Sequence, residues 1–187
     1  MLDFLYQIDK SLFYFFNVTI SNPFFDAIFP FITNIRNWIP VYFLGIVLII
    51  YYDRKRSWKI IIGLIILVVI SDQLSSQLLK NLFFRLRPMN DPYNIPIINV
   101  LIGHTSTGSF PSSHAVNNFA VAVFLGYYYQ SLKKYLYILA GLIAFSRIYV
   151  GAHYPSDVIA GILIGFIVGL TVLIFYNKII EKYFNES

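Results

Sequence analysis

The sequence predicts an all-α fold: a polytopic membrane helix bundle with five clear spans and an N-terminal helical region. Of the 187 residues, 58% are hydrophobic and only 12% are charged, whereas a soluble domain carries about 25% charged residues. Apolar runs near the length needed to cross a bilayer recur along the chain. The chain contains no cysteine, which excludes disulfides and zinc–thiolate sites. We therefore interpret residues 1–187 as one integral membrane domain.

The N-terminal region, residues 1–37, has the least regular pattern. Apolar residues recur at about helical spacing from Phe4 to Phe16, but polar and charged residues interrupt them. This pattern suits a helix that lies in the membrane interface as well as one that spans. A span over about residues 12–33 would contain two prolines. The region therefore supplies either a sixth span or an interfacial helix.

Five later segments are predicted to cross the membrane because they are apolar and bounded by aromatic or polar turns. They are residues 38–52, 58–70, 112–130, 135–145 with an extension to 150, and 158–176. The second segment continues into the amphipathic stretch 71–80, whose polar side should face other helices or a water-filled cavity. Residues 81–111 are rich in Pro, Asn, Gly, Ser and Thr. A loop of this length is more often functional than idle.

Basic residues gather in two turns and at the C-terminal end of the chain. They are Arg54, Lys55, Arg56 and Lys59, then Lys133 and Lys134, then Lys178 and Lys182. With the predicted spans, all of them fall on one side of the membrane, which is therefore the predicted cytoplasmic side. Residues 80–114 and 147–153 then share the opposite face. Because orientation in the bilayer explains these charges, no nucleic-acid partner is expected.

Two short motifs on the non-cytoplasmic face combine helix ends with polar residues. Lys80 and Arg87 are about two helical turns apart, so a continuing helix would bring both cations to one face. Basic residues at helix ends also commonly snorkel, so this motif alone is weak. Ser112, Ser113 and His114 directly precede an apolar helix, where free N–H groups form an anion site. The alternative is an ordinary serine cap beside an interfacial histidine.

A third motif places Arg147, His153 and Asp157 between two apolar runs. Pro155 suits the first turn of the last helix. A carboxylate four residues after a histidine can accept its ring N–H, which leaves the other ring nitrogen free as a nucleophile. The alternative is an interfacial loop in which Arg147 meets lipid headgroups and Asp157 caps a helix.

The three motifs read Lys-x6-Arg-Pro, Pro-Ser-Ser-His and Ser-Arg-x5-His-x3-Asp, in that order. This arrangement resembles the type 2 phosphatidic acid phosphatase superfamily, whose site is shared with vanadium haloperoxidases. The resemblance covers residues 80–157 directly and implies that residues 1–187 form a single phosphatase domain. The family most often has glycine where this chain has Ser113, and a small serine keeps the backbone N–H at that position.

The resemblance also implies the roles of the site residues. His153 would be the nucleophile that forms a phosphohistidine, Asp157 would orient it, and His114 would protonate the leaving oxygen and later activate water. Three fixed cations can hold the phosphate oxygens without a metal, and the three histidines lack tight ligand spacing, so we expect no metal and no cofactor. Arg85, whose spacing differs from the motif, is expected to face solvent or headgroups. The implied phosphate-binding residues are Lys80, Arg87, Ser112, Ser113 and Arg147.

The predicted activity is hydrolysis of a phosphate mono- or diphosphate ester of a membrane lipid at the non-cytoplasmic leaflet. The resemblance suggests a bacterial inner membrane, with the site facing the periplasm or the outside. Undecaprenyl diphosphate, lipid A 1-phosphate and phosphatidylglycerol phosphate are candidate substrates. One alternative is a lipid-to-lipid phosphotransferase. Another is a non-catalytic protein that binds or transports lipid phosphates, but it gives no reason for a His–Asp pair. The sequence predicts no oligomeric state.

Overall fold

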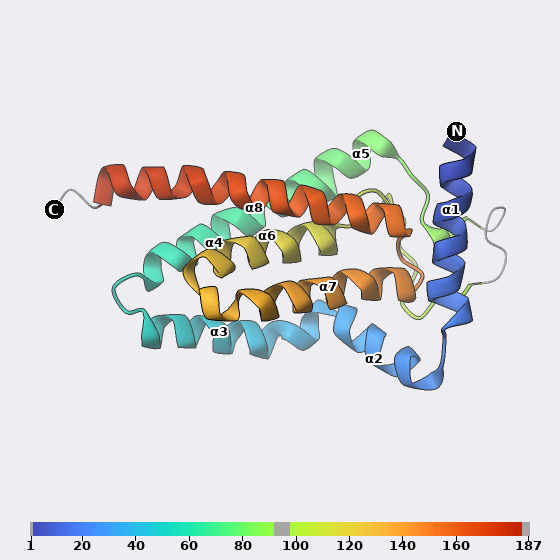
Figure 1. Cartoon of the computed structure of the whole chain (residues 1–187), viewed down its shortest axis with the longest axis horizontal. Coiled ribbons are helices and arrows are strands. Elements are labelled where there is room, and N and C mark those ends of the chain that lie inside the picture. Colours follow the sequence, from blue (N-terminus) through green and yellow to red (C-terminus); the bar gives the residue numbers. More distant parts are fainter. Residues whose placement is uncertain (1, 92–97, 185–187) are drawn as a thin grey trace.

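The computed structural model describes residues 2–91 and 98–184, and these residues are helical or irregular, with no strand among them. The longer helices run roughly along the long axis of the molecule, and α1 stands across one end (Figure 1). Shorter 3-10 or π-helical turns connect or extend several helices. The helices are α1 (Leu2–Tyr14), α2 (Pro23–Thr33), α3 (Ile39–Tyr52), α4 (Ser57–Asp72), α5 (Lys80–Phe83), α6 (Ser113–Tyr128), α7 (Lys133–Tyr149) and α8 (Pro155–Phe184).

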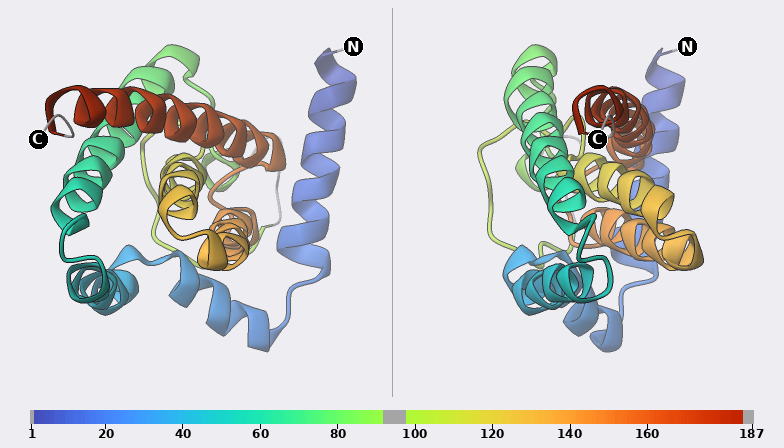
Figure 2. Two further views of the ribbon diagram at one scale, coloured as in Figure 1. Left: turned by 60° about the vertical axis from the view of Figure 1, so that its left-hand side comes forward. Right: turned by 90° about the vertical axis from the view of Figure 1, so that its left-hand side faces the viewer.

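Helix α6 occupies the centre of the bundle, between α4, α7 and α8 (Figure 2). Glycines on α8 allow this packing. A Cβ atom added at Gly165 would lie 2.6 Å from the Val116 carbonyl oxygen, and one added at Gly161 would lie 2.8 Å from that of Ser112. Small residues spaced four apart let helix backbones approach closely. The start of α6, which carries the second motif, is therefore held directly against the start of α8.

The all-helical membrane fold is confirmed, but the predicted number of spans is confirmed only in part. Among the described residues, three helical segments are long and apolar enough, by length and composition, to cross a membrane: Ile35–Tyr52, Ser57–Phe83 and Pro155–Ile180. Helices α6 and α7 have 16 and 17 residues, fewer than the roughly 20 that span a hydrocarbon core. They lie beside the longer helices (Figure 1). A total of five or six spans stays a prediction.

The N-terminal region forms two helices with a break between them. The Asn22 side chain caps α2 by accepting hydrogen bonds from the backbone N–H groups of Phe24 and Phe25, each at 3.1 Å. No continuous helix covers residues 12–33, and α2 has only 11 residues. Helix α1 crosses the end of the bundle (Figure 1). This arrangement fits an interfacial helix better than a sixth span.

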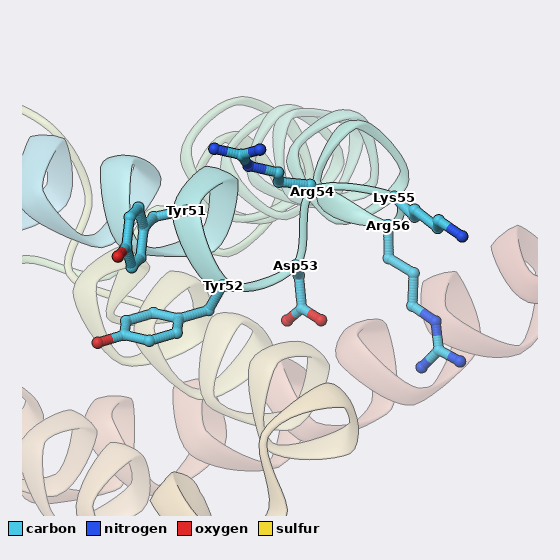
Figure 3. Close-up of a pocket in the computed structure, with 6 residues that line it drawn as sticks. All are labelled: Tyr51, Tyr52, Asp53, Arg54, Lys55 and Arg56. Atoms are coloured by element: carbon cyan, nitrogen blue, oxygen red, sulfur yellow. The ribbon is translucent and has the colours of Figure 1, made fainter.

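The basic turns and the three motifs lie at opposite ends of the bundle. The α3–α4 turn, the α6–α7 turn and the end of α8 are together at the left of Figure 1, whereas α8 begins at the right. The α3–α4 turn carries a surface hollow of about 320 Å³, lined by Tyr51, Tyr52, Asp53, Arg54, Lys55 and Arg56 (Figure 3). This hollow is at the far end from the motifs, so it takes no part in their chemistry.

Candidate active site

The three motifs converge where α6 and α8 begin and α7 ends. His153 is 1% exposed and Asp157 is 0% exposed, whereas His114 is partly exposed. The three cations Lys80, Arg87 and Arg147 are each exposed by 9% or less. Buried charges are stable only when they are paired or when they bind a charged group. A concentration of three buried cations therefore indicates a site for an anion.

The first motif is not one continuous helix, and that prediction is wrong. Helix α5 ends at Phe83, because Phe84 has a left-handed backbone conformation with φ 43°, which a right-handed helix cannot contain. Arg87 lies in the segment beyond this break. Its guanidinium donates to the Thr107 carbonyl at 2.9 Å, the Thr107 hydroxyl at 3.0 Å and the Ala152 carbonyl at 3.1 Å. The loop, not a helix face, holds Arg87 in place. Residues 92–97 of the predicted loop lie outside the described residues.

The protonation of the His153 ring follows from its neighbours. Nε2 lies 3.0 Å from Nη1 of Arg87. A guanidinium can donate but not accept, so Nε2 is the acceptor and carries no proton. The proton of the neutral ring is therefore on Nδ1, which lies 3.4 Å from the hydroxyl of Ser109.

Asp157 does not bond directly to His153, contrary to the expectation from sequence. Its Oδ2 is 3.8 Å from Nδ1 of His153, too far for a hydrogen bond. The Ser109 hydroxyl lies between them and donates to the same Oδ2 at 2.5 Å. That oxygen also accepts the Tyr154 N–H at 3.0 Å, which caps the start of α8. The carboxylate is held by its own helix, and Ser109 closes the remaining distance.

Burial and charge keep His153 neutral. Desolvation lowers the pKa of the His153 imidazole well below its ordinary 6.5, and the cations Arg87, Arg147 and Lys80 lower it further. Both effects disfavour the charged ring. At neutral pH the ring therefore has a free lone pair on Nε2.

Several buried polar atoms at the site have no protein partner. Among the described residues these include Ser112 Oγ, Ser113 Oγ and Arg147 Nε. An unpaired buried donor costs about 1–3 kcal/mol, so the three atoms indicate a polar ligand. Ser112 contributes its side chain only, because its backbone N–H already donates to the Asp157 carbonyl at 3.1 Å.

Elements outside the motifs position two more site residues. Arg147 Nη1 donates to the hydroxyl of Thr33, at the end of α2, at 2.5 Å. His114 is in the first turn of α6 and interacts with the Thr33 backbone, with Arg147 and with His153. The site thus depends on α2, where sequence reasoning proposed no functional residue. His104 is exposed, and its ring is 3.2 Å from the side-chain oxygen of Asn90.

Arg85 does not face solvent or headgroups, so that expectation is wrong. Its Nη1 lies 2.6 Å from Oδ1 of Asp157, and its Nη2 lies 2.6 Å from Oδ2 of Asp9 on α1. The guanidinium carbon also lies 4.1 Å from the ring centroid of Tyr154. The helix break at Phe84 leaves Arg85 in this position. One signal in the sequence pointed to such a residue: a buried Asp157 needs a cation.

The described residues contain no group of three or more His, Cys, Asp or Glu side chains that could hold a metal ion. Phosphoryl groups need positive charge around their oxygens. Lys80, Arg87 and Arg147 place buried positive charge at this site.

Comparison with known proteins agrees with this geometry. A sequence profile of the PAP2 superfamily matches residues 56–181. The lipid A 4'-phosphatase of Bacteroides thetaiotaomicron is 35% identical over 176 residues, which cover 88% of this chain and 75% of that protein. The undecaprenyl-diphosphatase BcrC of Bacillus subtilis is 28% identical over 169 residues, covering 88% and 80%. The crystal structure of Aquifex aeolicus LpxE matches with a TM-score of 0.67 at 26% identity, covering 89% of this chain and 94% of that one.

The helical membrane fold, the buried cationic site and these relatives define a membrane lipid phosphatase. The chain belongs to the PAP2 superfamily of type 2 phosphatidic acid phosphatases. The matched region contains all three motifs, helices α4–α7 and most of α8, whereas α1, α2 and α3 precede it.

Proposed function

We propose that the protein hydrolyses a phosphate ester or diphosphate of a lipid through a phosphohistidine on His153. The observation that carries this proposal is the contact between Arg87 Nη1 and His153 Nε2, which identifies Nε2 as the nitrogen with the lone pair. That lone pair attacks phosphorus, and the bond from phosphorus to the lipid oxygen breaks. His114 donates a proton to the leaving oxygen. It then takes a proton from water, which attacks phosphorus and releases phosphate from His153.

The buried cations support this reaction class. In-line phosphoryl transfer needs fixed positive charge around the equatorial oxygens more than it needs further covalent chemistry. We assign the phosphate oxygens to Lys80, Arg87 and Arg147, with the hydroxyls of Ser112 and Ser113 as neutral donors. We assign Asp157, acting through Ser109, to the orientation of the His153 ring. The unpaired donors of this set support the assignment.

Apolar side chains beside the cations favour a lipid substrate. The first motif has large apolar residues between Lys80 and Arg87, and their side chains are exposed. Leu82, Phe83, Phe84 and Leu86 are 58–78% exposed. Such a surface suits acyl or prenyl chains that bring their phosphate to Lys80 and Arg87. The basic turns at the opposite end of the bundle favour a site that opens to the non-cytoplasmic leaflet.

Lipid A phosphate is the first substrate to test, because a 35% identical relative is named a lipid A 4'-phosphatase. Undecaprenyl diphosphate is the second, because a 28% identical relative is named an undecaprenyl-diphosphatase. The test uses the protein purified in detergent, a panel of these lipids with phosphatidylglycerol phosphate, and a chelator. We expect phosphate release with chelator present. We also expect a phosphohistidine, which is labile in acid, to be trapped by denaturing the protein at alkaline pH.

Three outcomes would contradict the proposal. Binding of the lipids without turnover would indicate a binding or transport protein. Appearance of the phosphate on a second lipid instead of in solution would indicate a phosphotransferase. Normal turnover by the variant His153→Gln would show that His153 is not the nucleophile.

A further inference from the structure

A chain of side chains connects helix α1 to the proposed nucleophile. Asp9 on α1 pairs with Arg85, Arg85 pairs with Asp157, and Ser109 joins Asp157 to His153. We infer that Arg85 and Asp9 are positioning residues of the reaction, which hold the Asp157 carboxylate in the orientation that His153 requires. This inference rests on the proposed function, because it assigns a role relative to His153.

The two oxygens of Asp157 have separate partners. Oδ2 accepts from Ser109 and from the Tyr154 N–H, whereas Oδ1 lies 2.6 Å from Arg85. Rotation of the carboxylate would break all three contacts. Arg85 thereby determines which oxygen points to Ser109, and through Ser109 it sets the position of the His153 ring.

Asp9 fixes Arg85 in turn. Its Oδ2 lies 2.6 Å from Nη2 of Arg85, and its two oxygens accept from the backbone N–H of Ser156 at 2.8 Å and from its hydroxyl at 2.5 Å. Asp9 is itself only 7% exposed. Two buried carboxylates therefore meet at the positive N-terminal end of α8. Arg85 lies between them and offsets part of their negative charge.

Arg85 differs from the proposed phosphate-binding cations in its partners, because it pairs with two carboxylates, whereas among the described residues Arg87 donates only to neutral carbonyl, hydroxyl and imidazole groups. Nη1 of Arg85 donates to Ser156 Oγ at 2.7 Å and to Asp157, while Nη2 donates to Asp9. By contrast, Nε of Arg147 has no protein partner. The planar guanidinium, which can bridge two carboxylates, has both terminal nitrogens committed here. This distribution assigns Arg85 to positioning and not to phosphate binding.

Asp9 lies outside the region that matches the family, residues 56–181. The pairing therefore gives helix α1 a role in the reaction itself. We expect a chain that lacks the Asp9 carboxylate to keep its phosphate-binding cations and lose the alignment of its nucleophile.

The test measures kcat, KM and the inhibition constant of inorganic phosphate for Arg85→Gln, Arg85→Lys, Asp9→Asn and the double variant Asp9→Asn/Arg85→Gln. A misplacement of about 1 Å can cost about 100-fold in rate, so we expect kcat of Arg85→Gln to fall about 100-fold. The inhibition constant of phosphate should stay within about 3-fold, because the phosphate-binding cations are unchanged. Arg85→Lys should recover part of kcat, since it keeps the charge. The double variant should be no slower than Arg85→Gln, because Asp9 acts through Arg85.

Asp26→Asn is the matched control. Asp26 is a carboxylate on α2 that accepts from the Tyr149 hydroxyl at 2.6 Å and from Ser21 at 3.1 Å, so its loss should reduce stability and leave kcat unchanged. If Arg85→Gln does not fold, Asp9→Asn retains the cation and gives the same readout.

Two results would overturn the inference. One is unchanged kcat in folded Arg85→Gln or Asp9→Asn. The other is a phosphate inhibition constant that rises in step with the loss of kcat, which would make Arg85 a phosphate ligand. Neither result depends on the proposed function failing, because His153→Gln in the same assay tests that function separately.

Discussion

Nη1 of Arg87 lies 3.0 Å from Nε2 of His153, so one cation of the proposed phosphate site also determines the tautomer of the proposed nucleophile. A phosphate oxygen bound by Arg87 would take over this donor at the moment when Nε2 needs its lone pair. Under the proposed function, a single guanidinium would therefore couple substrate binding to activation of the nucleophile.

Replacement of Arg87 by lysine should affect both binding and turnover. The variant Arg87→Lys loses the fork that donates to Thr107 and Ala152 as well as to His153. A hydrogen bond to a charged group contributes about 1.5–3 kcal/mol, so we expect kcat/KM to fall about 10- to 100-fold, with changes in both constants. Steady-state kinetics on the preferred lipid measures this. A change in KM alone would contradict the role of Arg87 in setting the tautomer of His153.

The two histidines should respond differently to the leaving group. General acid catalysis contributes about 10²- to 10⁴-fold, so His114→Gln should lose about that much on an alkyl lipid phosphate. It should lose much less on p-nitrophenyl phosphate, whose leaving group needs no proton. His153→Gln should be inactive on both substrates. Equal losses for His114→Gln on the two substrates would rule out its role as the acid.

Acid should destabilise the protein partly through His153. Its pKa in the folded state is well below 6.5, so at pH values just under 6.5 the unfolded chain binds a proton that the folded chain does not. The contribution of His153 to the free energy of unfolding therefore has its full value above about pH 6.5. It decreases as the pH drops towards the pKa of the folded state. The His153→Gln variant lacks this contribution. Between about pH 8 and pH 5, the thermal midpoint of the natural sequence should therefore fall more steeply than that of the variant as the pH is lowered. A constant gap would contradict the prediction.

Glycine packing between α6 and α8 should tolerate no added methyl group. In Gly165→Ala the new Cβ would lie 2.6 Å from the Val116 carbonyl oxygen, which is backbone and cannot rotate away. Overpacking of this kind costs about 1–3 kcal/mol. Gly141→Ala on α7 is the control, since nothing lies within 4 Å of its Cβ and alanine there should stabilise by about 0.4–1 kcal/mol. Thermal unfolding in detergent measures both, and equal shifts would refute the packing argument.

The orientation can be tested directly, because the chain contains no cysteine. Ser106, in the loop beside the site, and Lys55, in the α3–α4 turn, are both exposed. In intact cells an impermeant thiol reagent should label Ser106→Cys and leave Lys55→Cys unlabelled until the membrane is opened. The opposite pattern would reverse the proposed orientation.

Much of the fold could be predicted from apolar runs and from the distribution of basic residues. The segments 38–52, 58–70 and 158–176 correspond to α3, α4 and α8, because a bilayer requires long apolar stretches. The bounds of the two shorter helices, α6 and α7, and of the N-terminal helices follow less directly from such apolar runs. Helix α6 packs against α4, α7 and α8, α2 packs against α7, and α1 packs against α8. These tertiary contacts, and not length and apolarity alone, stabilise the helices.

By itself the sequence determined the family and the residues proposed for the phosphate site, because three motifs with fixed spacing identify both. Only the tertiary structure decided how these residues are held. A left-handed residue at Phe84 breaks the helix and places Arg85 beside Asp157, and Ser109 enters the gap between Asp157 and His153. Asp9 joins them from a helix outside the motifs. Such contacts link residues up to 147 positions apart, and chain spacing cannot encode them because they depend on where loops and helix ends meet in space.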